Sequence, residues 1–330
     1  MTPHDAKALR ERIGPRRVVA SISGGKDSAA LSLYLRDLGI EHDRVFMDTG
    51  WEKDSTYEYL RGELARVVGP ITEIRGPRQM EELIQIKGMF PSRQRRFCTE
   101  ELKVRPMIRY IEALRADGVE CVNTIGIRGS ESEARSKLFE WDYEPDFGCE
   151  VWHPLLAWSE ADVIAIHQRH GLGPNPLYLA GASRVGCWPC LYARKDEIKL
   201  LAKVDPPRID RVRALEASVG EKAEERYDRD RAAWLEAPDA EPEAGTPRHE
   251  RWAQKKARLE APFKAPAFFQ AKLEEPGGGY PSWPIDRVVE WSRTAHGGRQ
   301  FELFASPREP GCMRWGLCDT DPPDAEGPVL

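Results

Sequence analysis

The sequence predicts an α/β fold, in which a parallel sheet is covered by helices on both faces, followed by a mainly helical C-terminal region. Short apolar runs alternate with segments of helical periodicity between residues 16 and 170, which is typical of strands that are connected by helices in a parallel sheet. Beyond Tyr192 the character changes, because residues 195–236 are highly charged and keep helical periodicity. We therefore predict an α/β domain over 1–192 and a charged, mainly helical region over 193–330.

The elements of the first domain are expected in alternating order. The expected strands are 16–23, 44–50 with its turn, 71–74 and 121–127. The expected helices are 27–38, 55–67, 79–86, 103–116 and one that starts at Ser159 with a capping-box-like order and reaches His170. In the second region, 237–248 is rich in Pro, Glu and Ala and is expected to be a linker or an exposed loop, and 249–330 carries short helical patterns.

A glycine turn joins the first strand to the first helix and predicts a phosphate-binding site. Backbone N–H groups and the positive end of a helix dipole meet at such a turn, and Gly24 and Gly25 let the backbone approach an anion closely. Lys26 adds a mobile positive charge. The alternative is an ordinary strand–helix turn. The candidate nucleotide-binding residues are Ser21, Ser23, Gly24, Gly25, Lys26, Asp27 and Ser28.

Two further turns are expected at the same edge of the sheet, where the parallel strands end. Asp48, in Asp48-Thr49-Gly50, could orient a ribose or help to hold Mg²⁺, or it could only cap a helix. In the stretch Gly126–Arg135, Arg128 and Arg135 could clamp phosphate or sulfate oxygens, although the stretch could also be a solvated helix start. The segments 152–163 and 175–178 are interpreted as framework.

The cysteines predict a metal or cluster site rather than disulfides. The chain has seven cysteines, and in a cytosolic protein these favour thiolate chemistry or metal ligation. Gly186-Cys187-Trp188-Pro189-Cys190 is a Cys-x-x-Cys pair, and Cys98 lies before a helix that begins near Lys103. We expect Cys121 in a buried strand and Cys149 in a loop, both with structural roles. Three alternatives are considered for this site: Zn²⁺ on four thiolates, an iron–sulfur cluster, or no metal.

The stretch Ser23–Ser28 resembles the PP-loop of the ATP pyrophosphatases and of the related adenine nucleotide alpha hydrolases, which have a Rossmann-like sheet. Asp48-Thr49-Gly50 and the Gly126–Arg135 stretch are similar to motifs of the phosphoadenosine phosphosulfate (PAPS) reductase-like branch. The resemblance covers about 16–192 well. It implies binding of ATP or an adenylyl sulfate with Mg²⁺, with Lys26, Asp27, Asp48, Arg128 and Arg135 as catalytic residues and Gly126 among the nucleotide-binding residues.

The resemblance also implies a [4Fe–4S] cluster, which is favoured over Zn²⁺. Assimilatory adenylyl-sulfate reductases carry two cysteine pairs, and the first pair is reduced here to Cys98 beside Phe97. Cys98, Cys187 and Cys190 would therefore need a fourth ligand, for which Cys312 and Cys318 are the candidates. Arg93-Gln94-Arg95-Arg96 could hold a polyanion or be a solvated basic loop.

Two enzyme reactions and one non-catalytic role compete. In the first reaction ATP is cleaved to AMP and pyrophosphate, and an activated acceptor receives sulfur, as in relatives that act in DNA phosphorothioation or tRNA thiolation. In the second, an adenylyl sulfate is reduced and sulfite is released, a reaction for which family members use a C-terminal Glu-Cys-Gly-Leu-His segment. This chain lacks that segment but keeps Lys26 and Asp27, and both departures favour ATP cleavage. The third is a nucleotide-sensing or DNA-defence subunit.

Charge and hydropathy limit the partners. The net charge of −5 does not indicate a surface for bulk nucleic-acid binding. No apolar run reaches the ~20 residues that cross a membrane, and the N-terminus lacks the order of a signal peptide, so we expect a cytoplasmic protein with no membrane partner. The expected partners are an adenine nucleotide, a sulfur or electron donor protein, and DNA or tRNA as an acceptor. The sequence allows a homo-oligomer but does not specify one.

Overall fold

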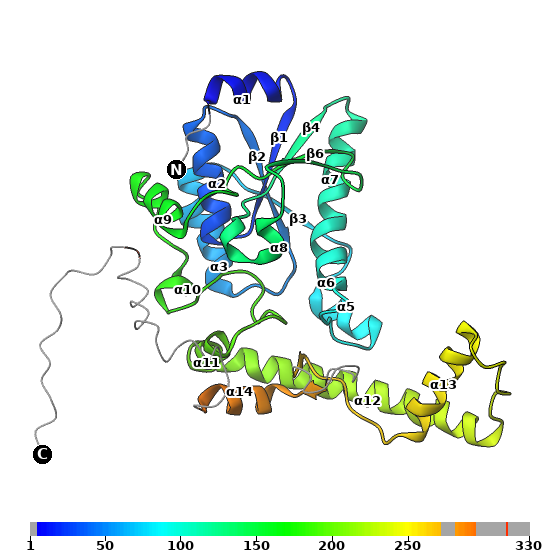
Figure 1. Cartoon of the computed structure of the whole chain (residues 1–330). Coiled ribbons are helices and arrows are strands. Elements are labelled where there is room, and N and C mark those ends of the chain that lie inside the picture. The colour runs from blue at the N-terminus through cyan, green and yellow to red at the C-terminus, as the bar shows by residue number, and fades with distance from the viewer. Residues whose placement is uncertain (1–4, 272–280, 295–314, 316–330) are drawn as a thin grey trace, which may run out of the picture. The chain divides into compact units, whose positions relative to one another are not determined.

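The computed structural model describes residues 5–271, 281–294 and 315, and it divides into two compact units (Figure 1). Unit 1 contains residues up to 79, residues 98–190 and the C-terminal stretch in which Trp315 is the described residue. Unit 2 contains residues 80–97 and 191–296. Cys312 and Cys318 lie outside the described residues.

Unit 1 is built on a six-stranded sheet with the order β3-β2-β1-β4-β6-β5. Its strands are β1 (Arg17–Ile22), β2 (His42–Asp48), β3 (Thr72–Arg75), β4 (Cys121–Thr124), β5 (Trp141–Glu144) and β6 (Cys149–Trp152). All neighbouring pairs are parallel except β5 and β6, which are antiparallel. The predicted α/β fold with a parallel sheet is confirmed, since β1 to β4 form near the predicted positions.

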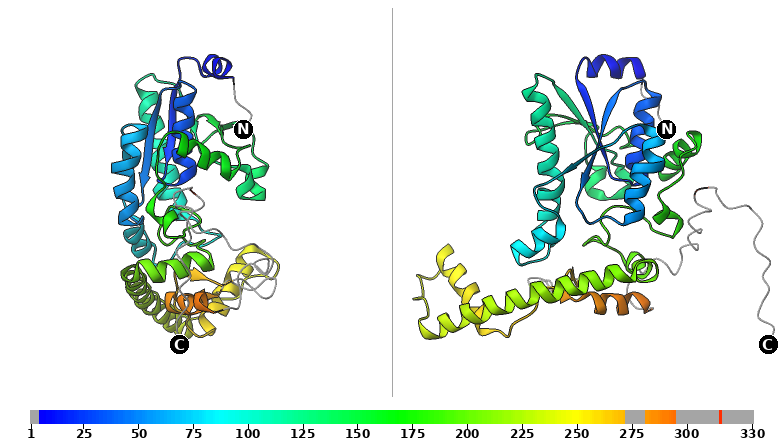
Figure 2. Two further views of the ribbon diagram at one scale, coloured as in Figure 1. Left: turned by 90° about the vertical axis from the view of Figure 1, so that its left-hand side faces the viewer. Right: turned by 180° about the vertical axis from the view of Figure 1, so that it is seen from behind.

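Helices cover both faces of this sheet (Figure 2). Because side chains alternate along a strand, Ala20 and Ile22 of β1 pack in the core with α2, whereas Val19 packs in a second core with Met107 and Ile111 of α7. Two of the helical segments of unit 1 are composite. In the first, α3 (Asp54–Tyr59) continues through a π-helical turn (Leu60–Leu64) into α4 (Ala65–Val68), and in the second, α6 (Phe97–Thr99) continues through a π-helical turn (Glu100–Val104) into α7 (Arg105–Ala116). The others are α1 (Ala6–Ile13), α2 (Lys26–Asp37), a 3₁₀ turn (Gly129–Glu131), α8 (Glu133–Ser136), α9 (Glu160–Arg169) and α10 (Pro176–Leu179).

The β5–β6 hairpin was not predicted from the sequence. Cys149, which was expected in a loop, begins β6 and is buried, whereas Cys121 lies in a buried strand as expected. Strand β5 is rich in exposed charged residues, so its apolar alternation is weak. The hairpin is held by the indole rings of Trp141 and Trp152, which stack with their centroids 5.0 Å apart.

Unit 2 is mainly helical, which confirms the expectation for the charged region. Its helices are α5 (Met80–Lys87), α11 (Lys195–Val204), α12 (Pro206–Glu236), α13 (Pro247–Glu260) and α14 (Ile285–Arg293), and the short strands β7 (Phe269–Gln270) and β8 (Ser282–Trp283) pair in antiparallel orientation. Apolar residues of α12 and the phenyl rings of Phe90 and Phe268, 5.7 Å apart, form its core. Among the described residues, no helix is long and apolar enough to cross a membrane.

Candidate functional site: a glycine loop and a thiol cluster

The glycine turn has the strand–turn–helix geometry that the sequence predicts. β1 ends at Ile22 and α2 begins at Lys26, with Gly25 as its extended N-cap residue. Gly24 has a φ of +72°, which favours glycine. A Cβ on Gly25 would lie 3.3 Å from the carbonyl oxygen of Val185, so the chain packs closely around the turn. Ser21 lies within β1, opposite Val45 of β2.

The two serines of the turn hold its shape. The backbone N–H of Ser23 donates to Oγ of Ser28 at 3.1 Å, and the Ser28 hydroxyl donates to the carbonyl of Gly25 at 3.0 Å. Ser28 is buried, while Ser23 is exposed. Ser28 therefore stabilises the loop from within, and its Oγ lies 3.2 Å from Oγ of the exposed Ser23.

Lys26 is buried although it carries a charge, and its ammonium is surrounded by polar partners. Nζ lies 3.6 Å from the carboxylate of Asp27 and 3.5 Å from that of Glu160, the first residue of α9. It also lies 3.4 Å from the carbonyl oxygen of Ser183 and 5.0 Å from the centre of the Tyr178 ring. Paired carboxylates and a π-face offset the cost of burying the ammonium.

Arg128 lies beside the glycine loop, as predicted. Its guanidinium is buried and donates from Nε to the carboxylate of Asp27, in an ion pair that joins α2 to the turn after β4. The approach depends on Gly126, because a Cβ at that position would lie 2.8 Å from the carbonyl oxygen of Asp27. Two cations, Lys26 and Arg128, thus meet two carboxylates, Asp27 and Glu160, at the start of α2.

Three side chains that sequence reasoning assigned to the framework or overlooked hold the backbone of this loop. The N–H of Lys26 donates to the hydroxyl of Tyr178 at 3.1 Å, and Nδ2 of Asn175 donates to the carbonyl of Gly24 at 3.2 Å. Nε2 of His167 bonds the carbonyl of Lys26 at 2.9 Å, and burial lowers the pKa of this histidine. The Asn175–Tyr178 stretch carried a sequence signal, but nothing in the sequence connected it to the loop.

Trp315, in the C-terminal stretch, packs beside the residues that hold the glycine loop. Its ring is 5.1 Å from that of His167 and 5.9 Å from that of Tyr178, and its carbonyl accepts a hydrogen bond of 3.0 Å from the side chain of Gln168. Trp315 is almost fully buried. It therefore packs against the two side chains that hold the Lys26 backbone.

Asp48 is engaged inside the protein. Its buried carboxylate accepts from the N–H of Gly50 at 2.9 Å, from the hydroxyl of Tyr57 at 2.6 Å and from Arg75 at 2.5 Å. The same hydroxyl lies 2.9 Å from the carboxylate of Glu52, so its single proton is shared between the two acids, and burial together with these carboxylates raises the pKa of Tyr57 far above its usual range. Asp48 thus orders the turn at the end of β2.

Of the predicted cysteine ligands, Cys187 lies beside that turn, and Cys98 and Cys190 lie close enough to act on the charge of Cys187. Oγ1 of Thr49 is 3.9 Å from Sγ of Cys187. Burial raises the pKa of Cys187 to about 11, while the ammonium of Lys103 opposes this rise and Cys190 and Cys98 add to it. In turn the thiolate of Cys187 raises the pKa of Lys103, to which it is hydrogen-bonded. Lys103 is a member of this site that the sequence reasoning did not single out.

The Cys-x-x-Cys segment is fixed to the Asp48 turn by backbone and indole contacts. The N–H of Trp188 donates to the carbonyl of Trp51 at 2.8 Å, and the indole of Trp51 donates to the carbonyl of Pro189 at 3.0 Å. Within residues 5–271, 281–294 and 315, no group of three or more His, Cys, Asp or Glu side chains is arranged to hold a metal ion. The two remaining candidate ligands, Cys312 and Cys318, lie outside the described residues.

The other predicted basic residues lie apart from the loop. Arg135 in α8 forms an exposed ion pair with Glu131, whose carboxylate also accepts from the N–H of Arg128 at 3.3 Å. Arg135 therefore contacts the Arg128 turn through Glu131. In unit 2, Arg93 and Arg96 stand over the ring of Tyr192 at 5.6 Å and 5.4 Å.

Comparison with known proteins assigns the family. The phosphoadenosine phosphosulfate reductase domain matches residues 17–193. An uncharacterized 37.8 kDa protein of Escherichia phage 186 is 30% identical over 341 residues, which cover 88% of this chain and 92% of that protein. An adenosine 5'-phosphosulfate reductase of Chelativorans is 27% identical over 177 residues, or 52% of this chain and 68% of that enzyme. A crystal structure of PAPS reductase from Candida auris matches with 21% identity and a TM-score of 0.45, over 58% of this chain and 90% of that one. Because the domain match covers more than half of the chain, the chain belongs to the phosphoadenosine phosphosulfate reductase domain family.

Proposed function

We propose that this chain is an enzyme of sulfur metabolism that binds ATP at the glycine loop and cleaves it between the α and β phosphates, so that pyrophosphate leaves and the adenylyl group passes to an acceptor. AMP then leaves when a sulfur donor attacks the activated acceptor. The observation that carries the proposal is the environment of Lys26. A buried ammonium at the first residue of α2, beside two glycines, is suited to stabilising negative charge on phosphate oxygens. Adenosine 5'-phosphosulfate carries fewer negative charges than ATP, so the two cations Lys26 and Arg128 favour ATP over that substrate.

In this proposal the N–H groups of the loop and Lys26 hold the pyrophosphate half, and Arg128 meets the α-phosphate. Mg²⁺ fits the site, since Asp27 offers a carboxylate that is only partly buried, and Mg²⁺ in nucleotide sites takes one or two carboxylates plus phosphate oxygens. When bound, it would neutralise charge that develops on the phosphates. Both carboxylates already have partners, Asp27 in Lys26 and Arg128, and Asp48 in Tyr57, Arg75 and Gly50. Asp48 is almost fully buried whereas Asp27 is only partly buried, so we assign Asp48 to ordering the turn and Asp27 to the metal.

We also propose a [4Fe–4S] cluster on the cysteines that act on one another around Cys187, although the described side chains by themselves are not arranged as a metal-binding group. Cys98, Cys187 and Cys190 supply three thiolates of the four that a cluster takes, and we propose Cys312 or Cys318 as the fourth. A cluster would supply electron transfer or a rigid anchor. Lys103 balances thiolate charge next to Cys187. The segment 183–190 joins the two sites, because the carbonyl of Ser183 contacts Lys26 and Cys187 contacts the Thr49 turn.

The second candidate function is reduction of an adenylyl sulfate to sulfite and a nucleotide. It is favoured by the similarity to an enzyme named as an adenosine 5'-phosphosulfate reductase. That reaction needs a cysteine thiolate that attacks the sulfur atom. In this chain Cys318 would have to serve, and it could then not be the ligand of a cluster as well.

Product analysis tests both candidates. The protein, purified without oxygen, is incubated with Mg²⁺ and either ATP or an adenylyl sulfate, and the nucleotides are separated. We expect AMP and pyrophosphate from ATP, with a DNA, tRNA or small-molecule acceptor increasing the yield. Sulfite from an adenylyl sulfate with ATP untouched would replace the first candidate by the second. Tight binding of ATP without any product, even with reductant, sulfur donor and nucleic acid present, would reject both reactions.

A further inference from the structure

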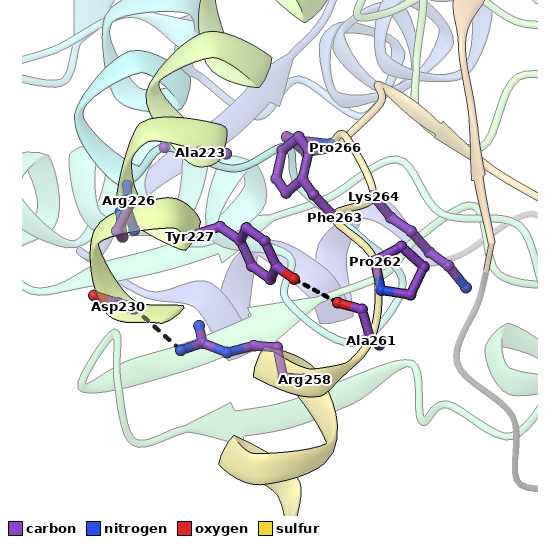
Figure 3. Close-up of a pocket in the computed structure, with 11 residues that line it drawn as sticks. Ala223, Arg226, Tyr227, Asp230, Arg258, Ala261, Pro262, Phe263, Lys264 and Pro266 are labelled. Carbon is purple, nitrogen blue, oxygen red and sulfur yellow. Dashed lines mark hydrogen bonds and ion pairs between the residues drawn. The ribbon is translucent and has the colours of Figure 1, made fainter. Parts of the chain in front are cut away.

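Unit 2 contains a pocket of about 370 Å³ that the nucleotide chemistry of unit 1 does not use (Figure 3). It lies between α12 and the segment that follows α13, and all its lining residues belong to unit 2. Its volume is at the low end of the ~300–1,000 Å³ typical of small-molecule sites. There is room for one flat, nucleotide-sized group, but not for a folded chain or a duplex.

The charge of the pocket is positive, in a chain that is acidic overall. Three cationic side chains line it, Arg226, Arg258 and Lys264, against one carboxylate, Asp230. Asp230 pairs with Arg258 at 3.2 Å, which leaves the charges of Arg226 and Lys264 unbalanced by any other acidic residue of the lining. Both are exposed, so a phosphate can reach them without an unfavourable burial of charge.

Helical spacing explains how a highly charged helix presents a basic face here. Ala223, Arg226, Tyr227 and Asp230 line the pocket at the i, i+3, i+4 and i+7 positions of α12. The acidic residues Glu224, Glu225 and Asp228, which lie between them in the sequence, fall on other faces and are not part of the lining. The positive charge of the pocket is therefore a property of one helix face and is not visible in the net charge of the segment.

Two aromatic rings form the apolar part of the pocket. The rings of Tyr227 and Phe263 have centroids 5.5 Å apart and are tilted by 43°. The Tyr227 hydroxyl donates to the carbonyl of Ala261 at 2.5 Å, which ties α12 to the segment that carries Phe263 (Figure 3). Gly88 leaves space for Arg226, because a Cβ there would be 2.5 Å from its guanidinium. Half-buried rings beside exposed cations match a base and its phosphate.

The basic character continues along α13, which ends at the pocket. This helix of 14 residues carries the basic residues Arg248, Arg251, Lys255, Lys256 and Arg258 against only Glu250 and Glu260. Lys255 stands over the ring of Trp234 at 5.3 Å, and Lys256 stands over that of Trp252 at 5.1 Å. Lys255 pairs with Asp239 at 2.6 Å and Arg258 pairs with Asp230, so Arg248, Arg251 and Lys256 are the charges of α13 that we assign to a ligand. A free mononucleotide in the pocket would not use them, whereas the backbone of a longer strand would.

We propose that unit 2 binds single-stranded nucleic acid, with one base in the pocket against Tyr227 and Phe263, and with phosphates on Arg226, Lys264 and the basic face of α13. Stacking on aromatic rings is tolerant of sequence, so recognition is by backbone charge and by an unpaired base. The inference goes beyond the proposed function, because it requires neither ATP cleavage nor a cluster in unit 1.

The test is binding of a fluorescently labelled oligothymidylate of about 12 nucleotides to the full chain, followed by fluorescence anisotropy at several salt concentrations without ATP. Arg226→Ala is compared with Arg229→Ala, which removes the same charge from the same helix at an exposed position outside the pocket. Loss of one phosphate contact should lower the salt slope by about 0.7 and weaken binding about five-fold at 0.1 M salt. Arg226→Ala should show this, and Arg229→Ala should bind like the unchanged chain.

The aromatic contribution is tested by Phe263→Ala and Phe263→Trp. Loss of the ring should weaken binding about ten-fold, and tryptophan should restore it, while circular dichroism checks that both variants are folded. Equal weakening in Arg226→Ala and Arg229→Ala would overturn the pocket as the site. Equal affinity for a duplex, or binding of thymidine monophosphate but not of the oligonucleotide, would overturn single-stranded nucleic acid as the ligand. Failure here leaves the products formed from ATP unchanged, so it is distinguishable from failure of the proposed function.

Discussion

The glycine loop and the thiol cluster lie in the same unit but are held together in different ways. The loop consists of consecutive residues, and its backbone and charged groups are bonded to Ser28, Asn175, Tyr178 and Arg128. The thiol cluster joins Cys98 to a pair about ninety residues away, and its buried Cys187 has a raised pKa. The conformation of the loop is thus held by contacts within the protein. Under the proposed function, the three thiols would instead be held in position by a bound cluster and its fourth ligand.

This difference makes the two sites separable by mutation. A change in the loop should remove nucleotide chemistry and leave the thiols in place. A change in the cluster should remove a bound metal and leave the nucleotide loop in place, because most loop contacts come from α2, α9, the Asn175–Tyr178 stretch and the Arg128 turn. Only the carbonyl groups of Ser183 and Val185 reach the loop from the segment that carries the Cys-x-x-Cys pair, among the described contacts. Effects that crossed from one site to the other would show that the segment 183–190 couples them.

The largest effect is expected for Lys26→Ala. Removing the ammonium takes away one of the two cations beside Asp27 and the cation that Glu160 faces, and under the proposed function the charge that develops on the phosphates loses its partner. We expect turnover of ATP to fall by at least about 10²-fold, with iron content unchanged. Lys7→Ala, which removes an exposed ammonium from α1, is the matched control. Unchanged turnover in Lys26→Ala would reject the assignment of the loop.

The next effect is expected for Cys187→Ser under the proposed cluster. Iron and acid-labile sulfide per chain should fall to near zero, because a serine hydroxyl is a poor replacement for a thiolate ligand. The affinity for ATP, measured by calorimetry, should remain. Cys149→Ala is the control, since Cys149 is buried in β6 away from the Thr49 turn. Loss of iron in both variants alike would mean that folding, and not ligation, is being measured.

Gly126→Ala should disturb the loop without removing a functional group. The added Cβ would lie 2.8 Å from the carbonyl oxygen of Asp27 and 3.3 Å from Cα of Ser28, and backbone atoms cannot move aside cheaply. We expect a loss of about 1–3 kcal/mol in the free energy of unfolding and weaker ATP binding, measured by urea denaturation and calorimetry. Gly62→Ala, where nothing lies within 4 Å of the added Cβ, should cost nothing comparable. Equal stability of both variants would contradict the close approach.

The sequence predicted the features that depend on residues close together in the chain. It did not predict contacts between segments that are distant in the sequence. The loop, the helix start at Lys26 and the N-cap at Ser159 follow from local patterns, and each is confirmed. Asn175 and Tyr178 bond the loop from 151 and 152 positions away, a relationship that no local spacing encodes. Likewise Lys103 is recognised as part of the thiol site only in the folded chain, where the π-helical turn before α7 places it beside Cys187.

The smallest effect is expected for Trp315 in the C-terminal stretch. It tests whether contacts from outside the glycine loop help to hold the loop in position. Trp315 packs on His167 and Tyr178, and both bond the backbone of Lys26. Trp315→Ala should therefore loosen the loop and weaken ATP binding by about two- to ten-fold, which corresponds to the ~0.5–1.5 kcal/mol of an aromatic pair. Because Trp315 would act by positioning, KM should rise while kcat stays, and Trp315→Phe should restore most of the affinity. A fall in kcat with unchanged KM would instead assign the C-terminal stretch to the chemical step.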